Sequence, residues 1–270
     1  MSRKPAEIAE TICSQYNGKT GIPMAKVFLL AILAGAYVSF GGYLFIVVTS
    51  DAAAYVGYGL AGVIGGLVFS IGLILIVLGG GELFTGNGLF TISCLSGKAR
   101  FVDMLKNWVT VYAGNLVGSL LLVVLVFAGG SYLANGGEVA VRVLQISSSK
   151  VGISFMDALI RGILCNWLVC LAVWLANSAN DTTGKILAII FPISAFVAMG
   201  FEHSVANMFF IPLGILVSGD PALVAGAGVS VGGLNLAGFV GNLIPVTIGN
   251  IIGGAVFVAA AYWYAYMRKQ

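Results

Sequence analysis

The only histidine in the sequence, His203, lies in a short polar interruption of a long apolar stretch. The interruption reads Gly200-Phe-Glu-His-Ser-Val-Ala-Asn-Met-Phe-Phe210. A neutral imidazole can hold an anion by donating a hydrogen bond, and an imidazole also takes up and releases protons near neutral pH. An ionisable group in apolar surroundings needs a partner or an aqueous path, and it is by default a candidate functional group. The sequence therefore makes His203 the centre of a candidate site for an anion or a proton.

A similar interruption occurs 120 positions earlier, as Gly80-Gly-Glu-Leu-Phe-Thr-Gly-Asn-Gly-Leu-Phe90. The two segments share four residue types at matching places, namely glycine at 80 and 200, glutamate at 82 and 202, asparagine at 87 and 207, and phenylalanine at 90 and 210. Thr85 adds a hydroxyl group that can donate or accept a hydrogen bond. Paired breaks of this kind indicate a transport site built from discontinuous membrane helices in the two halves of an internal repeat.

The matching carboxylates and amides have a different expected role. A carboxylate that faced the path would repel an anion. We therefore expect Glu82 and Glu202 to accept hydrogen bonds from backbone amides, because buried charges need compensation. Asn87 and Asn207 can brace the same loops. These four residues are predicted to support the broken segments.

The breaks themselves predict a pathway. A helix can be broken inside the hydrocarbon layer only where the freed backbone groups are buried in protein or face an aqueous cavity. Each helix that resumes after a break presents N-terminal amides that carry about half a positive charge, and two such ends that converge favour an anion. Large apolar side chains such as Leu83 and Phe196 lie close enough to the breaks to form constrictions that exclude water.

The composition is that of a membrane protein with several crossings. Hydrophobic residues make up 59% of the 270 residues and charged residues only 9%, whereas about a quarter of a soluble domain is charged. Each crossing needs about 20 apolar residues, so the length suits one domain of about six crossings. The net charge of +3 is not gathered into a basic stripe. We therefore expect a lipid bilayer, and no nucleic acid, as a partner.

Apolar runs and breaking residues place six crossings along the sequence. The expected boundaries are 23–49, 59–79, 104–130, 153–176, 185–217 and 243–266. The second crossing resumes over 87–95 after its break, the fifth is broken across 200–206, and a polar connection containing Arg142 and Lys150 precedes the fourth. Residues 1–21 carry charges throughout and predict an amphipathic cytoplasmic helix on the membrane surface, with Ile8, Ile12 and Cys13 on one side. Residues 22–270 are expected to form a single channel domain.

A second set of matches relates the third and sixth crossings. Asn107 and Gly114-Asn-Leu-Val-Gly118 match Asn242 and Gly249-Asn-Ile-Ile-Gly253 at a constant offset of 135. A unit of three crossings reverses its direction when it is duplicated. The repeat halves, about 22–131 and 153–267, should therefore be related by a pseudo-two-fold axis in the membrane plane. The predicted fold is an all-α membrane protein with an inverted 3+3 repeat in which helices 2 and 5 are broken.

An even number of crossings places both termini on one side, and the basic residues indicate which side. Ten lysines and arginines fall on the side of the termini, namely Arg3, Lys4, Lys19, Lys26, Lys98, Arg100, Lys106, Lys185, Arg268 and Lys269. Only Arg142, Lys150 and Arg161 fall on the opposite side. Both termini are therefore predicted to be cytoplasmic, with the protein in the cell (inner) membrane.

An enzyme or a metal centre finds little support in these residues. Cys13, Cys94, Cys165 and Cys170 do not form a close ligand quartet and are expected to be structural. One histidine with these thiols is too few ligands for a catalytic zinc site, and no cofactor is expected. An intramembrane enzyme that used His203 with Glu202 or a cysteine is a weak rival, because no nucleophile or metal constellation accompanies them.

The chain resembles the formate/nitrite transporter family, which also includes hydrosulfide channels. The resemblance covers about 26–264 and depends on five segments, namely Glu82-Leu-Phe-Thr-Gly86, Asn107 with Gly114-Asn-Leu-Val-Gly118, Cys165-Asn-Trp-Leu-Val-Cys-Leu-Ala-Val-Trp174, Gly200-Phe-Glu-His-Ser-Val-Ala-Asn-Met208 and 242–254. It implies an aquaporin-like fold of six helices in each protomer, a homopentamer, and a separate pore through each protomer. The Asn-Pro-Ala pair of aquaporins is absent, so likeness to them would be architectural only.

The resemblance also implies roles for single residues. The pore threonine of the family falls on Thr85, its central histidine on His203, and its hydrogen-bonded asparagine on Asn166. Its apolar constrictions fall on four large side chains, Leu83 and Phe196 toward the cytoplasm and Phe69 and Leu73 toward the outside. A lysine that draws anions toward the pore in relatives would be Lys150.

The expected substrate is a small monovalent anion of a weak acid: formate, nitrite or hydrosulfide, with a slight preference for formate. In this hypothesis Lys150 concentrates the anion, which then sheds water at a phenylalanine slit and reaches Thr85 and His203. A bare charge is costly in an apolar passage, so proton donation by or through His203 could release a neutral acid. The anion could instead cross unprotonated. The alternative function is an aquaporin-like channel for a neutral small solute, which would need neither Lys150 nor a titratable group in the pore.

Overall fold

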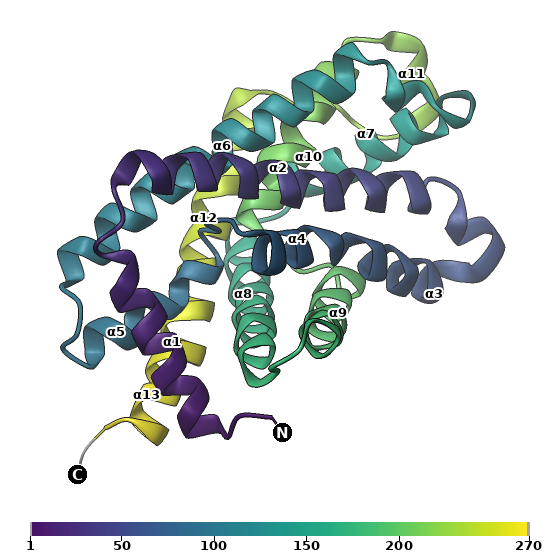
Figure 1. Ribbon diagram of the computed structural model, residues 1–270. Helices are drawn as coiled ribbons and strands as arrows, with labels where there is room; N and C mark the ends of the chain where they lie inside the picture. The colour runs from purple at the N-terminus through teal and green to yellow at the C-terminus, as the bar shows by residue number, and fades with distance from the viewer. Residues whose placement is uncertain (1, 269–270) are drawn as a thin grey trace.

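The computed structural model describes residues 2–268, and every regular element in that part of the chain is a helix (Figure 1). Helices suit a membrane because each satisfies its own backbone hydrogen bonds. Five helical segments are long and apolar enough to cross a bilayer, namely Met24–Thr49, Ala52–Gly79, Phe101–Ala128, Phe155–Ser178 and Leu236–Tyr266. Lys269, counted above among the basic residues near the C-terminus, lies outside the described residues.

These five segments match five of the expected crossings. They are α2 (Met24–Thr49), α3 (Ala52–Phe69) with α4 (Ile71–Gly79), α6 (Phe101–Ala128), α8 (Phe155–Ser178), and α12 (Leu236–Gly254) continued by the π-helix η4 (Ala255–Ala260) and α13 (Ala261–Tyr266). The expected fifth crossing is divided between α9 (Thr182–Ala198) and α10 (Ser204–Val217), which residues 199–203 separate. After α10 the chain bends by 118° into α11 (Pro221–Ala227).

The two halves of the chain repeat the same helix packing. Helix α2 packs along α6, and α8 packs along α12. In the first pair Gly114 and Gly118 of α6 lie against the backbone of α2, and in the second pair Gly249 and Gly253 of α12 lie against the backbone of α8. A side chain at these positions would overlap the neighbouring helix, so glycine permits the close approach. The packing is therefore repeated in the two halves, as a 3+3 repeat predicts.

Both predicted breaks are present. After α4 the chain is not helical until the 3₁₀ helix η1 (Gly86–Phe90), which leads into α5 (Thr91–Leu95). Gly80 and Gly200, with φ of 91° and 69°, end α4 and turn the chain after α9. Glycine fits both places because other residues rarely adopt a positive φ. Helix α10 begins at Ser204, directly after His203, rather than after residue 206 as expected.

The charged N-terminal segment forms α1 (Pro5–Lys19), whose apolar side is covered by protein. Ile8, Ile12, Cys13 and Tyr16 are buried among residues that include Phe90, and α1 contacts η1, α5, α8 and α13 (Figure 1). The surface expected to face lipid is therefore covered by other helices of the same chain. The polar connection before the fourth crossing also contains an unexpected helix, α7 (Glu138–Val151).

Candidate functional site

The two breaks meet at a contact between Thr85 and His203. Thr85 Oγ1 and His203 Nε2 lie 3.0 Å apart, although the residues are separated by 118 positions in the sequence. Both side chains are buried, with 1% and 4% of their surface exposed. The contact joins the hydroxyl group of the first interruption to the imidazole of the second.

The backbone determines which nitrogen of His203 carries the proton. The N–H of Ala206 donates to His203 Nδ1 over 3.0 Å, and a backbone N–H is always a donor. Since Nδ1 must accept, a neutral imidazole carries its proton on Nε2 and donates it to Thr85 Oγ1. The hydroxyl proton of Thr85 is then free to donate to another acceptor.

Asn166 holds the backbone of the same site. Its Nδ2 donates to the carbonyl oxygens of Thr85, at 3.1 Å, and of Asn250, at 2.6 Å. Cys170 Sγ also lies 3.4 Å from the Thr85 carbonyl oxygen. Asn166 thus contacts Thr85 through the main chain rather than through the hydroxyl group. Within residues 2–268, no group of three histidine, cysteine, aspartate or glutamate side chains is arranged to hold a metal ion.

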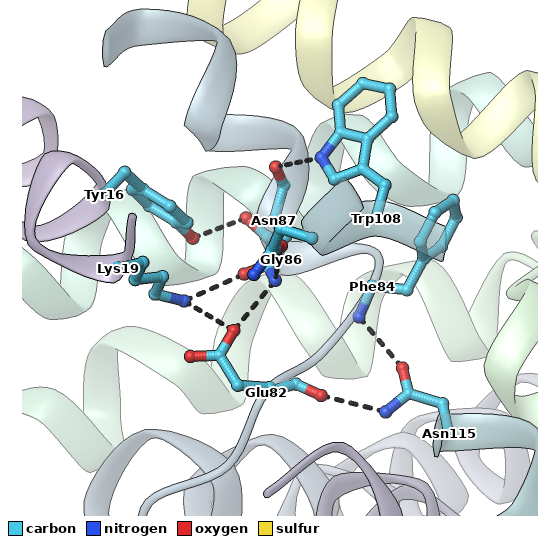
Figure 2. A network of polar contacts seen from close by, with 9 residues as sticks. Tyr16, Lys19, Glu82, Phe84, Gly86, Asn87, Trp108 and Asn115 are labelled. Carbon is cyan, nitrogen blue, oxygen red and sulfur yellow. Dashed lines mark hydrogen bonds and ion pairs between the residues drawn. The ribbon is translucent and has the colours of Figure 1, made fainter. Parts of the chain in front are cut away.

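The glutamate of the first break lies in the polar network drawn in Figure 2. Glu82 Oε2 is 2.9 Å from Lys19 Nζ of α1 and accepts a hydrogen bond of 2.9 Å from Asn87 Nδ2. Lys19 Nζ also donates to Asn87 Oδ1 at 3.0 Å, and Asn87 Nδ2 donates to Asn107 Oδ1 at 2.8 Å. The carboxylate is therefore compensated by a lysine that the sequence did not connect with it.

The glutamate of the second break has the same kind of partners. Glu202 Oε1 is 2.9 Å from Lys150 Nζ, and Glu202 Oε2 accepts a hydrogen bond of 2.6 Å from Asn207 Nδ2. Asn207 Nδ2 also donates to Asn242 Oδ1, and Asn242 Nδ2 donates to the Lys150 carbonyl, both at 2.8 Å. The expectation that the glutamates accept from backbone amides is wrong in both breaks. Lysines from α1 and α7, far away in the sequence, fill that role.

Two buried asparagines cap the backbone after the breaks. The N–H of Phe84 donates to Asn115 Oδ1 and the N–H of Ser204 donates to Asn250 Oδ1, both over 2.9 Å. The Nδ2 of each asparagine returns a bond of 2.9 Å to the carbonyl of the glutamate in the same break. Both residues are part of the repeat motif predicted from the sequence, but they had no assigned role. The feature that could have identified them is an asparagine at the same place in two apolar helices. Their bonds leave fewer backbone amides free for an anion than the helix-end argument assumed.

Two cavities approach the Thr85–His203 contact. The Lys150 cavity has a volume of about 210 Å³, and its lining includes Lys150, Phe69, Phe196 and His203. The Lys19 cavity has a volume of about 380 Å³, and its lining includes Lys19, Glu82, Leu83, Asn87 and Leu73. Helices α1 and α7, which carry the two lysines, lie toward opposite ends of the molecule in Figure 1. The arrangement is a buried polar contact with one charged cavity on each side.

Four buried apolar side chains line the two cavities, but not in the expected groups. Phe69 and Phe196 meet edge to face, with ring centroids 5.8 Å apart, in the wall of the Lys150 cavity. Leu73 and Leu83 line the Lys19 cavity. The grouping of Leu83 with Phe196, and of Phe69 with Leu73, is therefore wrong. In an inverted repeat the two breaks lie toward opposite sides, so Leu83 and Phe196, each beside a different break, cannot share one side.

Comparison with known proteins gives matches along nearly the whole chain. Residues 6–264 match the family described as "Formate/nitrite transporter". The chain is 42% identical to the "Probable formate transporter" of Methanothermobacter thermautotrophicus, over 99% of this chain and 98% of that protein. It is 41% identical to the "Formate channel FocA" of Escherichia coli K12, over 91% of this chain and 88% of that protein. A solved structure described as "Pentameric formate channel with formate bound" superposes with a TM-score of 0.81 at 40% identity, covering 91% of this chain and 98% of that one.

Proposed function

The chain belongs to the formate/nitrite transporter family, and we propose that it conducts formate across the cell membrane through a passage centred on Thr85 and His203. The choice of formate is supported by relatives described as formate channels and by a solved relative that holds formate. Nitrite and hydrosulfide are chemically plausible for the same passage, because each is a small monovalent anion of a weak acid.

The passage runs from the Lys150 cavity, between Phe69 and Phe196, past His203 and Thr85, and between Leu73 and Leu83 into the Lys19 cavity. The side chains that line it near its middle are buried, so the structure corresponds to a closed passage that small movements of the apolar side chains would open. Lys185, in the wall of the Lys19 cavity, makes no ion pair within residues 2–268 and favours an anion over the neutral solute of the alternative function.

The Thr85–His203 contact carries the proposal. With Nδ1 of His203 engaged by Ala206 and Nε2 donating to Thr85, the threonine hydroxyl offers its proton to a passing oxyanion. An imidazolium would need a proton on Nδ1 as well, which would face the N–H of Ala206. Direct proton donation by His203 therefore requires the Ala206 bond to open, whereas the neutral imidazole can act as a donor without any change.

Flux measurements in reconstituted vesicles test both parts. Vesicles containing the wild-type protein should take up formate faster than empty vesicles, with nitrite and hydrosulfide as comparisons. If the wild-type flux does not change with pH or with added competing anions, the result favours the alternative function, a channel for a neutral small solute. The pH dependence of formate flux is then compared between the wild type and His203→Phe. An unchanged pH dependence in the variant would exclude the proton-relay version.

Assembly and orientation complete the proposal. The two cavities and the Thr85–His203 contact lie between helices of a single protomer, which supports a separate pore in each protomer, and the related solved structure is described as pentameric. We propose a homopentamer, with residues 22–270 as the channel domain and both termini in the cytoplasm. The excess of lysine and arginine on the side of the termini supports that orientation. Labelling of single cysteines near each terminus from one side of intact cells tests it.

A further inference from the structure

The Lys150 cavity contains a second cation, Arg142, for which the proposed passage has no role. Arg142 lies on α7 and lines the cavity together with Lys150, Phe69, Phe196 and other residues. Within residues 2–268 the ion pairs are Lys19–Glu82, Arg100–Asp103 and Lys150–Glu202. Arg142 is in none of them. Glu138, four residues earlier on the same helix, is exposed and makes no ion pair with it.

The position of Arg142 follows from the helical period of α7. Residues 142, 145, 146, 149 and 150 line the cavity, and their spacing of three and four places them on one face of the helix. Arg142 lies two turns before Lys150, ~12 Å along the axis. The polar face of α7 thus carries one cation at the level of Glu202 and a second cation two turns away from it.

The two cations differ in what they can offer an anion. The ammonium group of Lys150 is 2.9 Å from Glu202 Oε1, so the pair is neutral at close range. The guanidinium group of Arg142 uses only Nε, which donates to Thr49 Oγ1 over 3.2 Å. Its Nη1 and Nη2 have no hydrogen-bond partner in the described part of the chain. These two nitrogens form the edge of a guanidinium that can donate two parallel hydrogen bonds.

The surroundings of Arg142 partly shield Nη1 and Nη2 from solvent. The side chain is half-buried, and the cavity wall includes the rings of Phe45, Phe69 and Phe196. Burial lowers the pKa of Arg142 from its usual value, but an arginine stays charged in proteins. A charge that is partly withdrawn from water and lacks a carboxylate partner gains most from an anion that enters the cavity.

We propose that Arg142 is the anion receptor of the Lys150 cavity and that it selects planar anions with two oxygens. Formate and nitrite each present two oxygens in a plane, which match the paired N–H groups of a guanidinium. Hydrosulfide presents a single sulfur atom and cannot make the paired contact. The inference rests on the proposed passage of anions through this cavity, and it assigns the selective contact to Arg142 rather than to Lys150.

Initial flux into vesicles, measured against formate concentration, tests the proposal with Arg142→Lys and Arg142→Gln. A receptor in the vestibule governs how flux saturates, so both variants should raise the half-saturating formate concentration roughly three- to tenfold, with maximal flux near that of the wild type. Arg142→Lys keeps the positive charge but loses the paired N–H groups of the guanidinium. It should therefore shift formate and nitrite while leaving the hydrosulfide curve within about twofold of the wild type.

Two control variants separate anion recognition by Arg142 from a general effect of positive charge and from a disturbance of the local structure. Arg161→Gln removes an exposed arginine of α8 that does not line the cavity, and Thr49→Val removes the partner of Arg142 Nε while keeping the guanidinium. Both should leave the half-saturating concentration within about twofold of the wild type.

The possible failures are distinguishable. If the wild type carries no formate, nitrite or hydrosulfide, the proposed function is wrong. If the wild type carries them, four results would overturn the receptor role: unchanged half-saturation in Arg142→Gln, an equal shift in Arg161→Gln, the same defect in Thr49→Val, or an equal shift for hydrosulfide in Arg142→Lys.

Discussion

Leu83 and His203 occupy the same place in the two halves of the repeat, each directly after the glutamate of its break. Leu83 lines the Lys19 cavity and His203 lines the Lys150 cavity. The supporting bonds around them are alike, since each neighbouring glutamate binds one lysine and one asparagine. The scaffold is therefore nearly symmetric, whereas the imidazole is present on one side only.

Removing the hydroxyl of Thr85 should lower formate flux without unfolding the protein. Thr85→Val keeps the shape of the side chain but removes both the acceptor for His203 Nε2 and the donor for an anion. We expect roughly a tenfold loss of flux in vesicles, as for a hydrogen bond to a charged group. Thr91→Val, on α5, is the matched control, because within residues 2–268 the one hydrogen bond of the Thr91 hydroxyl is a long contact of 3.7 Å to Met104 Sδ. Similar flux in both variants would contradict the role given to Thr85.

The ion pair of the second break should be strongly coupled. Its side chains are 14% (Lys150) and 6% (Glu202) exposed, so Glu202→Gln or Lys150→Met alone leaves an uncompensated buried charge and should cost about 3 kcal/mol of stability. The double variant should recover part of this loss. Unfolding monitored by circular dichroism in detergent measures the loss in each single variant and the recovery in the double variant.

The exposed ion pair Arg100–Asp103 is the control for this comparison of single and double variants. Arg100 is 81% exposed, and breaking an exposed pair should change stability far less than breaking the buried pair, because water screens the charges. Additive effects of Glu202→Gln and Lys150→Met would show that the two side chains do not stabilise the break together.

Adding one methyl group between α8 and α12 should destabilise the second half of the repeat. A Cβ at Gly253 would overlap the backbone of Ile163, and the close approach of the helices cannot be kept. We expect Gly253→Ala to lose at least about 2 kcal/mol of stability or to fail to fold, as overpacked sites do. Gly241→Ala on the same helix meets nothing within 4 Å and should be neutral. Size-exclusion profiles and thermal unfolding of the two variants decide between these outcomes.

The docking of α1 should weaken in alkali. Burial, and then the charge of Glu82, raise the pKa of Tyr16 well above its usual value, and the phenol donates to the Gly86 carbonyl oxygen over 2.7 Å. Because the folded pKa is higher than the unfolded one, this stabilisation is complete below about pH 10 and is lost as the pH rises toward the folded pKa. Hydrogen exchange of α1 should therefore accelerate in that range.

Tyr16→Phe is the control for the alkaline release. The variant cannot ionise at this position, so its α1 should exchange at a rate without the extra alkaline rise. If wild type and variant show the same pH profile above pH 10, after correction for intrinsic exchange, the phenol does not govern the docking of α1.

Much of the architecture could be predicted because it depends on local and periodic features. Apolar length indicated the crossings, and the paired Gly-x-Glu segments indicated the breaks, since a break inside a bilayer requires unusual residues. The partners of the glutamates could not be predicted in this way. Lys19 and Lys150 come from α1 and α7, and a charged residue in a polar segment carries no sign of the buried carboxylate that it will meet.

Two other expectations, the grouping of the constrictions and the surroundings of α1, depended on how the helices are arranged in space. The number of residues between two positions does not give that arrangement. Phe196 lies seven positions before His203 in the sequence, yet its side of the molecule depends on the direction in which α9 runs. The apolar side of α1 suited lipid and protein equally well. Only the packing of Ile12 and Tyr16 against the residues around Phe90 decides for protein.

The pairing of each buried glutamate with a lysine has an electrical consequence. A membrane potential does work of about 2.3 kcal/mol per unit charge for each 100 mV that the charge crosses. Moving either loop together with its lysine would displace no net charge along that field. Opening by such a movement would therefore be indifferent to the membrane potential, and any steep voltage dependence of the current would have to come from the permeating ion or from Arg142.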